Sequence, residues 1–313
     1  MSSGPAGRRD RIDPSPEHAD DAAARGIDRR SFLGVMGAGC VGAVGLQQSG
    51  TEEEQTVPDP LGVLVDTTRC AGCRSCEFAC AEAHGLPAPD PDFSVLEHER
   101  ATSETQLSVV NRYETDKGVV NVKRQCMHCL QPACASACLT RAMYKTPEGP
   151  IVWREGRCMG CRFCMVSCPF DVPKFEYHDA NPRILKCDLC AERRAEGQEP
   201  ACVASCPVKA LTFGRRSELI QEARRRIYGS SDRYINRIHG ELDVGGTSWL
   251  YLAGVPFEQL GFRTDLGTTP YPVLTKEFLY GVPIVLTLLP PALLAISNAT
   301  KGKEATDVEE GDA

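Results

Sequence analysis

The sequence lacks the short motifs that mark several classes of enzyme, and it lacks an excess of positive charge. It contains no H-E-x-x-H zinc motif, no G-x-S-x-G nucleophile elbow and no phosphate-binding P-loop. The formal net charge is -7, which does not favour a nucleic-acid partner. The length of 313 residues predicts one or two domains, and an apolar content of 42% suffices for a hydrophobic core. No sequence motif outside the cysteine-rich region predicts a catalytic centre.

Cysteine is the residue type in excess. The chain has 17 cysteines, far above the average for this length but below the density of a small disulfide scaffold. Only Cys40 stands outside a regular spacing. The other cysteines form four quartets: Cys70, Cys73, Cys76 and Cys80; Cys126, Cys129, Cys134 and Cys138; Cys158, Cys161, Cys164 and Cys168; and Cys187, Cys190, Cys202 and Cys206.

The spacing within the quartets favours iron-sulfur clusters. The first and third quartets follow the bacterial ferredoxin pattern C-x2-C-x2-C-x3-C, and Pro169 completes it in the third. The second and fourth keep the opening C-x2-C and the closing C-x3-C. Zinc sites bring together two separate pairs and do not explain three closely spaced thiolates, and disulfides need no such repeated register. Four 4Fe-4S clusters would use all the quartet cysteines.

Glycines lie where the chain must wrap tightly around a cluster. Gly72 in "CAGC" and Gly160 in "CMGC" would let backbone N-H groups approach the cluster sulfurs.

The order of the quartets predicts which of them share a module. "AMYKTPEGPIVW", between Cys138 and Cys158, predicts a β-hairpin, as found between the two runs of a ferredoxin. The second and third quartets would then form an inner module, and the first and fourth an outer one. In two-cluster ferredoxins the fourth cysteine of one run binds the other run's cluster. The hypothesised ligand sets are Cys70, Cys73, Cys76 and Cys206; Cys80, Cys187, Cys190 and Cys202; Cys126, Cys129, Cys134 and Cys168; and Cys138, Cys158, Cys161 and Cys164.

With these motifs the sequence resembles a known family, the four-cluster ferredoxin-type subunits of membrane-bound oxidoreductases. The resemblance runs from about Gly62 to Gly214 through "CAGCRSCEFAC", "QCMHCLQPACASAC", "CMGCRFCMVSCP" and "KCDLC...ACVASCP". It is closest to the HybA-type periplasmic hydrogenase subunit, beside the iron-sulfur subunits of formate dehydrogenase and dimethyl sulfoxide reductase. It implies an α+β fold of two nested ferredoxin-like modules.

The resemblance also implies a non-catalytic role in electron transfer between a catalytic subunit and a quinone-reactive membrane subunit. A nickel-iron hydrogenase partner is the leading interpretation. A molybdopterin oxidoreductase of the formate, polysulfide or sulfoxide type, or a cytochrome-fed menaquinone reductase, is the alternative. A reductase working at one of its own clusters would need a cluster with a free iron site, and the complete cysteine set speaks against it. A zinc-built scaffold is a third hypothesis, which iron and acid-labile sulfide analysis would distinguish.

Polar residues near the quartets have two interpretations. His128 lies inside "CMHC", and we expect it to point outward rather than to tune a cluster. Seven basic residues could offset the negative charge of the clusters, or could be ordinary surface charge. They are Arg69, Arg74, Lys123, Arg124, Arg157, Arg162 and Lys186.

In the C-terminal part the sequence predicts a helix, a strand and a membrane-spanning anchor. "SELIQEARRRIYG" indicates an amphipathic helix ended by Gly229, and "GTSWLYLAGVPFEQLGF" a strand or extended arm whose Trp249, Tyr251 and Phe257 are either core or partner-contacting residues. Residues 278 to 296 contain no charge and are long enough to span a bilayer, with a docking helix as the alternative. Lys301 and Lys303 would place the C-terminus in the cytoplasm and the clusters on the periplasmic side.

The stretch "RRSFLGVMGAGCVG" at Arg29–Gly42 admits several interpretations. Its G-x-G-x-x-G follows no predicted strand, so a dinucleotide site is not favoured, and the apolar part is short for a permanent membrane helix. Arg29-Arg30-Ser31-Phe32-Leu33 resembles a twin-arginine export signal, and Cys40 is expected to be neither a ligand nor a lipid attachment site.

The predicted organisation has six parts. They are a signal region (1–46), a linker (47–61), the four-cluster domain (62–214; outer module 62–125 with 183–214, inner module 126–182), a partner-docking extension (215–277), a single transmembrane helix (278–297) and a cytoplasmic acidic tail (298–313).

Overall fold

The structure is a computed structural model that describes residues 59–180 and 182–307. The predicted export signal and Cys40 lie outside these residues. The strands are β1 (Leu61–Asp66), β2 (Val109–Thr115), β3 (Gly118–Arg124), β4 (Met143–Lys145), β5 (Ile151–Trp153), β6 (Lys174–Phe175), β7 (Ile184–Leu185), β8 (Leu211–Arg215) and β9 (Trp249–Leu252). The α-helices are α2 (Ser75–Ala83), α3 (Ala133–Ser136), α4 (Phe163–Val166), α5 (Ala191–Ala195), α6 (Ala201–Ala204), α7 (Arg216–Gly229) and α8 (Tyr271–Asp307). Short 3-10 turns are η1 (Phe93–Glu97), η2 (Glu155–Arg157), η3 (Asp243–Gly245) and η4 (Phe257–Leu260).

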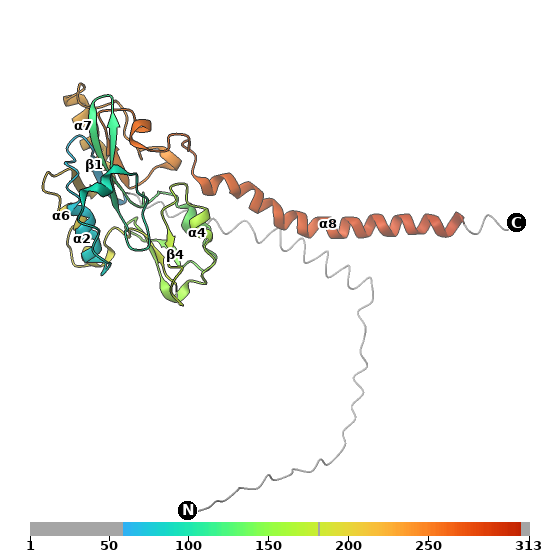
Figure 1. Ribbon diagram of the computed structural model, residues 1–313. Coiled ribbons are helices and arrows are strands. Elements are labelled where there is room, and N and C mark those ends of the chain that lie inside the picture. The colour runs from blue at the N-terminus through green and yellow to red at the C-terminus, as the bar shows by residue number, and fades with distance from the viewer. Residues whose placement is uncertain (1–58, 181, 308–313) are drawn as a thin grey trace, which may run out of the picture. The chain divides into compact units, whose positions relative to one another are not determined.

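A three-stranded sheet in the order β8-β1-β9 forms the centre of the fold (Figure 1). β1 pairs antiparallel with β8 and parallel with β9. Its sequence "LGVLVD" is a nearly continuous apolar run, as expected of a strand covered on both faces. Because side chains alternate along a strand, β1 points Leu64 to one face of the sheet and Val63 and Val65 to the other.

Helix α7 covers one face of this sheet. Its Leu219, Ala223 and Ile227 recur every four residues and pack with Leu64 and Leu250. The amphipathic helix predicted here, with its end at Gly229, is confirmed.

The other face of the sheet packs against the cysteine-bearing loops. Trp249 and Tyr251 of β9 are fully buried in the same cluster as Cys187 and Cys202. The strand predicted in this stretch is confirmed, and Trp249, Tyr251 and Phe257 are core residues. Residues 249–252, within the extension predicted to dock a partner, thus complete the central sheet.

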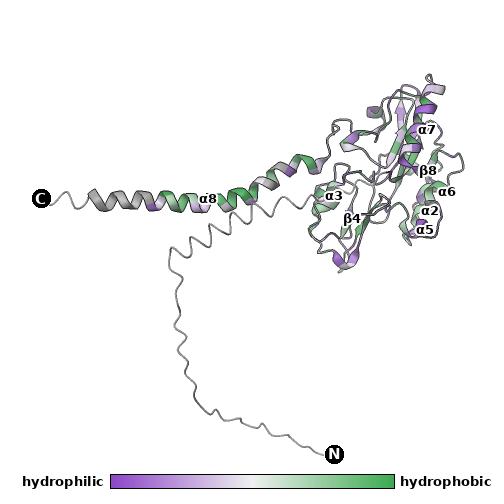
Figure 2. Cartoon of the chain, turned by 180° about the vertical axis from the view of Figure 1, so that it is seen from behind, coloured by the Kyte–Doolittle hydropathy of each residue, from purple (hydrophilic) through white to green (hydrophobic). Residues whose placement is uncertain are grey.

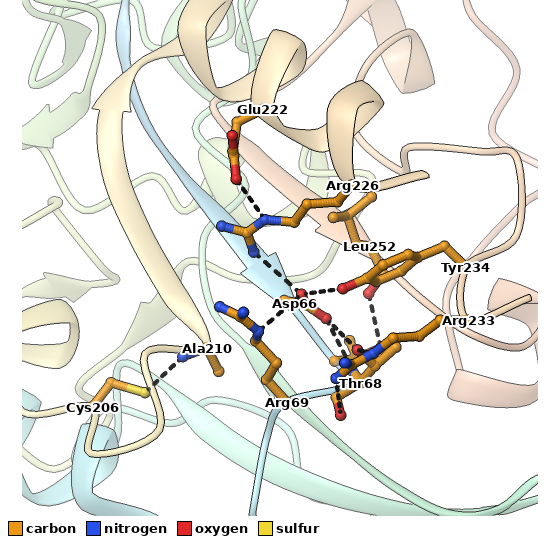
Figure 3. Close-up of polar contacts among 11 residues, drawn as sticks. Asp66, Thr68, Arg69, Cys206, Ala210, Glu222, Arg226, Arg233, Tyr234 and Leu252 are labelled. Carbon is orange, nitrogen blue, oxygen red and sulfur yellow. Dashed lines mark hydrogen bonds and ion pairs between the residues drawn. The ribbon is translucent and has the colours of Figure 1, made fainter. Parts of the chain in front are cut away.

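Pairing of β1 with β8 brings the first and fourth quartets together. β1 ends shortly before Cys70, β8 begins shortly after Cys206, and Val65 pairs with Leu211. Asp66 secures this end of β1, since its carboxylate accepts hydrogen bonds from Thr68, Tyr234 at 2.7 Å and Arg226 at 3.2 Å (Figure 3).

One hairpin joins the second quartet to the third, and another joins the third to the fourth. β4 and β5 pair antiparallel in the stretch predicted as a hairpin between Cys138 and Cys158, which confirms it. β6 and β7 pair between Cys168 and Cys187. Helix α3 packs against α4, and α2 packs against α6, so the inner and outer quartets form separate helix pairs.

The C-terminal helix α8 contains one stretch long and apolar enough to cross a membrane. It runs over Tyr271–Asn298 and contains Pro283, Pro290 and Pro291, and its most apolar window of 18 residues has a mean hydropathy of 2.0 (Figure 2). Phe278 and most of the apolar side chains between Ile284 and Ile296 are exposed.

Candidate metal centres

Left-handed residues shape the cysteine loops. In each quartet the second residue between the first two cysteines has a positive φ: Gly72 at 70°, His128 at 48°, Gly160 at 70° and Leu189 at 60°. Such turns direct successive backbone N-H groups to one side and form a concave site for an anion. Glycine fits this conformation without strain, which is why sequence reasoning identified two of the four positions and missed the other two.

One cavity lies between the first and fourth quartets. It is lined by Cys70, Cys73 and Cys76 together with Cys206 and Lys123. The backbone N-H of Ala210 donates to the sulfur of Cys206 at 3.3 Å (Figure 3). Four sulfur atoms therefore surround a space bordered by a backbone donor and a buried cation.

A second cavity lies between the second and third quartets. It is lined by Cys126, Cys129, Cys134 and Cys168, so the last cysteine of the third quartet lies with the first three of the second. Burial, followed by the charges of Cys126 and Cys168, raises the pKa of Cys129 far above its ordinary value.

A third group joins helix α2 to the fourth quartet. Burial raises the pKa of Cys202 to about 11 despite Lys123, with the charges of Cys80 and Cys190 acting in the same direction. Burial likewise raises the pKa of Cys187, and Cys80 is among its charged neighbours.

The fourth group surrounds Cys164 of α4. Burial, with the charges of Cys138, Cys158 and Cys161, raises the pKa of Cys164 to about 11. The sulfur of Cys138 accepts the backbone N-H of Met143 at 3.3 Å. Cys161 is exposed, whereas Cys164 is buried.

These groups fit iron-sulfur clusters chemically. None of the sixteen cysteines in the described part of the chain forms a disulfide. A buried thiol with a raised pKa stays protonated unless a cation stabilises the thiolate, and coordinated iron supplies that charge. Backbone N-H donors complete the environment of thiolate-bound clusters.

His84 and Asp188 lie beside the third group. His84, Asp188 and Cys190 place possible ligand atoms within 4.8 Å of one another. However, Nε2 of His84 contacts Oδ1 of Asp188 at 2.9 Å, and Asp188 also accepts the backbone N-H of Cys190 at 2.8 Å. This arrangement fastens the fourth-quartet loop to the end of α2. Sequence spacing gave no signal for this pair, because its members are 104 residues apart.

His128 does not point outward, so that expectation was wrong. It is completely buried, and its Nδ1 accepts the backbone N-H of Ile151 at 2.9 Å. Burial, with the nearby charge of Lys186, holds its pKa well below the ordinary value. A neutral His128 therefore links the second quartet to β5.

The flanking basic residues divide into two classes. Arg69, Arg157 and Arg162 are exposed and Arg124 is half-buried, whereas Arg74, Lys123 and Lys186 are buried. Surface charge is therefore the wrong interpretation for the last three. Arg74 pairs with Glu77 at 3.0 Å, whereas Lys123 lies among cysteines. Burial alone would lower the pKa of Lys123, but the negative charges of four cysteines together raise it above its ordinary value; they are Cys202, Cys76, Cys187 and Cys80.

Comparison with known proteins agrees with this chemistry. A family model described as a 4Fe-4S dicluster domain matches residues 119–216. A protein of Nitratidesulfovibrio vulgaris (strain Hildenborough) is 46% identical over 297 residues, covering 91% of this chain and 80% of that protein. Hydrogenase-2 operon protein HybA of Escherichia coli O157:H7 is 31% identical over 317 residues, covering 88% and 96%. The B subunit of the anaerobic dimethyl sulfoxide reductase of Shigella flexneri is 37% identical over 165 residues, covering 50% and 75%.

The cysteine groups and their loops define a ferredoxin-type protein that binds 4Fe-4S clusters. The protein belongs to the family of ferredoxin-type iron-sulfur electron-transfer subunits that includes HybA.

Proposed function

We propose that this protein relays electrons through four 4Fe-4S clusters between a catalytic subunit and a quinone-reactive membrane subunit. The observation that carries the proposal is a pair of cavities, each lined by four cysteines from two different segments of the chain. The charges of the other eight cysteines act on one another across segments in the same way. The groups support the four ligand sets hypothesised from the ferredoxin pattern, with the fourth cysteine of each quartet crossing to another cluster.

The residues of the chain hold, bury and solvate the clusters. Each bound cluster accepts and releases one electron at a time, so the chain can pass on electrons that a donor gives up in pairs. Backbone N-H groups such as those of Ala210 and Met143 stabilise the added negative charge at cysteine sulfurs. We assign the chain itself no catalytic step.

The partner in the leading proposal is a nickel-iron hydrogenase. It is favoured by the HybA relative, which matches this chain over 96% of its own length. A molybdopterin oxidoreductase is the second candidate, because the B subunit of a dimethyl sulfoxide reductase is also related, although over 50% of this chain.

We further propose that the clusters face the periplasm. The twin-arginine stretch at Arg29–Arg30 would export the folded, cluster-loaded protein, and the apolar part of α8 would anchor it by a single span. Lys301 and Lys303 would then remain in the cytoplasm.

Metal analysis tests the cluster content. The full chain, purified without oxygen, is expected to contain about sixteen irons with matching acid-labile sulfide and low-temperature EPR signals of reduced 4Fe-4S clusters. About half that iron in a fully loaded preparation would reject the four-cluster arrangement, and zinc without sulfide would reject electron transfer altogether.

Isolation of the native complex tests the partner and the membrane location. Nickel in the co-purifying catalytic subunit supports the hydrogenase assignment, and molybdenum without nickel contradicts it in favour of the second candidate. Retention in membranes after a carbonate wash supports the anchor, whereas release by carbonate would show that α8 is not a membrane span.

A further inference from the structure

Two lysines are buried among the cysteine groups. Lys123 at the end of β3 is 2% exposed, and Lys186, directly before Cys187, is 6% exposed. In the described part of the chain neither forms an ion pair with a carboxylate. A buried ammonium group without a counter-charge is costly, so each lysine requires anions nearby.

The surroundings of Lys123 fix its ammonium group between the two outer cysteine groups. Its Nζ donates to Oε1 of Gln125 at 3.0 Å and lies 4.8 Å from the centre of the Trp249 ring. Gln125 is held in turn by the hydroxyl of Tyr251 at 2.6 Å. The side chain of Lys123 is therefore held in place by Gln125 and by Trp249 of β9, and it does not reach solvent.

The charged neighbours of Lys123 belong to two ligand sets. Cys76 belongs to the set of Cys70, whereas Cys80, Cys187 and Cys202 belong to the other outer set. Lys123 also lines the cavity of the Cys70 group. One cation is thus shared by two proposed clusters.

Lys186 occupies a corresponding place beside a different group. Its Nζ donates to the backbone carbonyls of Ile151 at 2.5 Å and Cys187 at 2.9 Å. Ile151 lines the cavity of the Cys126 group, and the charge of Lys186 acts on Cys134 and Cys168 of that set. The charge of Lys186 also acts on Asp188, whose carboxylate is hydrogen-bonded to His84.

The group around Cys164 differs from the other three because no lysine is among the charged groups that act most strongly on Cys164. The strongest influences on Cys164 are burial and the negative charges of Cys138, Cys158 and Cys161. The neighbouring Arg162 is exposed, and its guanidinium lies over the rings of Phe175 at 5.3 Å and Tyr177 at 5.6 Å.

We propose that the fixed positive charges of Lys123 and Lys186 set the reduction potentials of three clusters. Lys123 acts on the two outer clusters, and Lys186 acts on the cluster of Cys126. Reduction adds one negative charge to a cluster, and a fixed cation in a low-dielectric interior stabilises that charge. Loss of the cation therefore lowers the potential. This inference rests on the proposed four-cluster arrangement.

The test is an EPR-monitored redox titration of the full chain in its native complex, comparing wild type with K123M and K186M. We expect K123M to shift the midpoint potentials of two clusters downward and K186M to shift that of one other cluster. The fourth cluster should keep its potential in both variants, which makes each variant the matched control for the other. Unchanged potentials, or shifts of the same clusters in both variants, would overturn the proposal.

Iron content and charge-keeping variants separate the possible causes of failure. A wild type that lacks four clusters refutes the proposed function, whereas fully loaded variants with wild-type potentials refute only the role of the lysines. If K123M loses its clusters, K123Q and K123R decide the matter. Loss in K123Q with retention in K123R supports the need for the charge, and loss in all three variants shows a purely structural role and overturns the proposal.

Discussion

His84 and Asp188 form a half-buried contact between helix α2 and the loop of the fourth quartet, with 2.9 Å between Nε2 and Oδ1. Burial alone would lower the pKa of His84, but the hydrogen bonds and negative charges of Asp188 and Cys80 together outweigh this effect, and the pKa rises to about 11. The unfolded value is about 6.5. The stabilisation is therefore complete below about pH 6.5 and is lost as the pH rises towards the folded value.

The raised pKa of His84 predicts that the effect of His84→Gln on stability depends on pH. The variant should lose about 2 kcal/mol at pH 6, and its stability should fall less between pH 6 and 9 than that of the wild type. The measurement is the temperature at which half of the cluster absorbance is lost, recorded across this pH range. His178→Gln, at an exposed position, is the control. Equal pH slopes in H84Q and wild type would contradict the assignment.

Because the fourth cysteine of one quartet lies with the first three of another, Cys168→Ser should affect a cluster distant from it in the sequence. Because Cys168 lines the cavity of Cys126, Cys129 and Cys134, the variant should lose or alter that cluster. The cluster of its sequence neighbour Cys164 should remain. EPR spectra and iron content report which signal is affected.

Two further variants make this result specific. Cys164→Ser should change a different EPR signal from Cys168→Ser, and Cys40→Ser should leave the iron content unchanged. Identical spectra for the Cys164 and Cys168 variants would show that the ligands do not cross between quartets.

Gly72 and Gly160 provide a matched pair for separating backbone strain from packing. Both have a φ of 70°, so alanine at either position costs about 1 kcal/mol in left-handed strain. A Cβ at Gly72 would lie 2.6 Å from Oδ1 of Asn121, whereas a Cβ at Gly160 would meet nothing within 4 Å. Gly72→Ala should therefore destabilise the protein by about 1–3 kcal/mol more than Gly160→Ala. Thermal loss of cluster absorbance in the two variants measures the difference, and equal losses would refute the packing argument.

Tyr251→Phe tests the contribution of β9 to the cluster-bearing core. The buried hydroxyl donates to the carbonyl of Lys123 at 2.9 Å and accepts from Nε2 of Gln125 at 2.6 Å. Its removal leaves two buried polar groups without their partner and should cost about 1–3 kcal/mol. Tyr228→Phe, at a position 78% exposed, should have almost no effect. A stability loss as small as that of Y228F would show that the hydrogen bonds contribute little.

The cluster chemistry could be predicted from the sequence, because the spacing of the cysteines within each quartet is a local feature. The hairpin after Cys138 and helix α7 were also predictable, since turn residues and a four-residue apolar period define them. The burial of His128 and Lys123 was not predictable in the same way. Both residues are polar, and Ile151 beside His128 and Trp249 beside Lys123 become neighbours only through the tertiary fold.

The pairing of β9 with β1 was likewise outside the reach of local patterns. The stretch around Trp249 indicated a strand, but nothing in it identified β1 as its partner, because strand pairing over such a separation depends on topology. The left-handed residues His128 and Leu189 were missed because the sequence signal for a positive φ is glycine.

The position of β1 between β8 and β9 has a consequence for biosynthesis. β1 is among the first described elements to leave the ribosome, yet one of its neighbouring strands ends at Leu252. A nascent chain that stops at Gly214 already carries every quartet cysteine but leaves one edge of β1 unpaired and Trp249 missing from the core. We therefore expect the sheet against which the cysteine loops pack to be completed only after the segment that follows the last cysteine has been made, late in translation or after it.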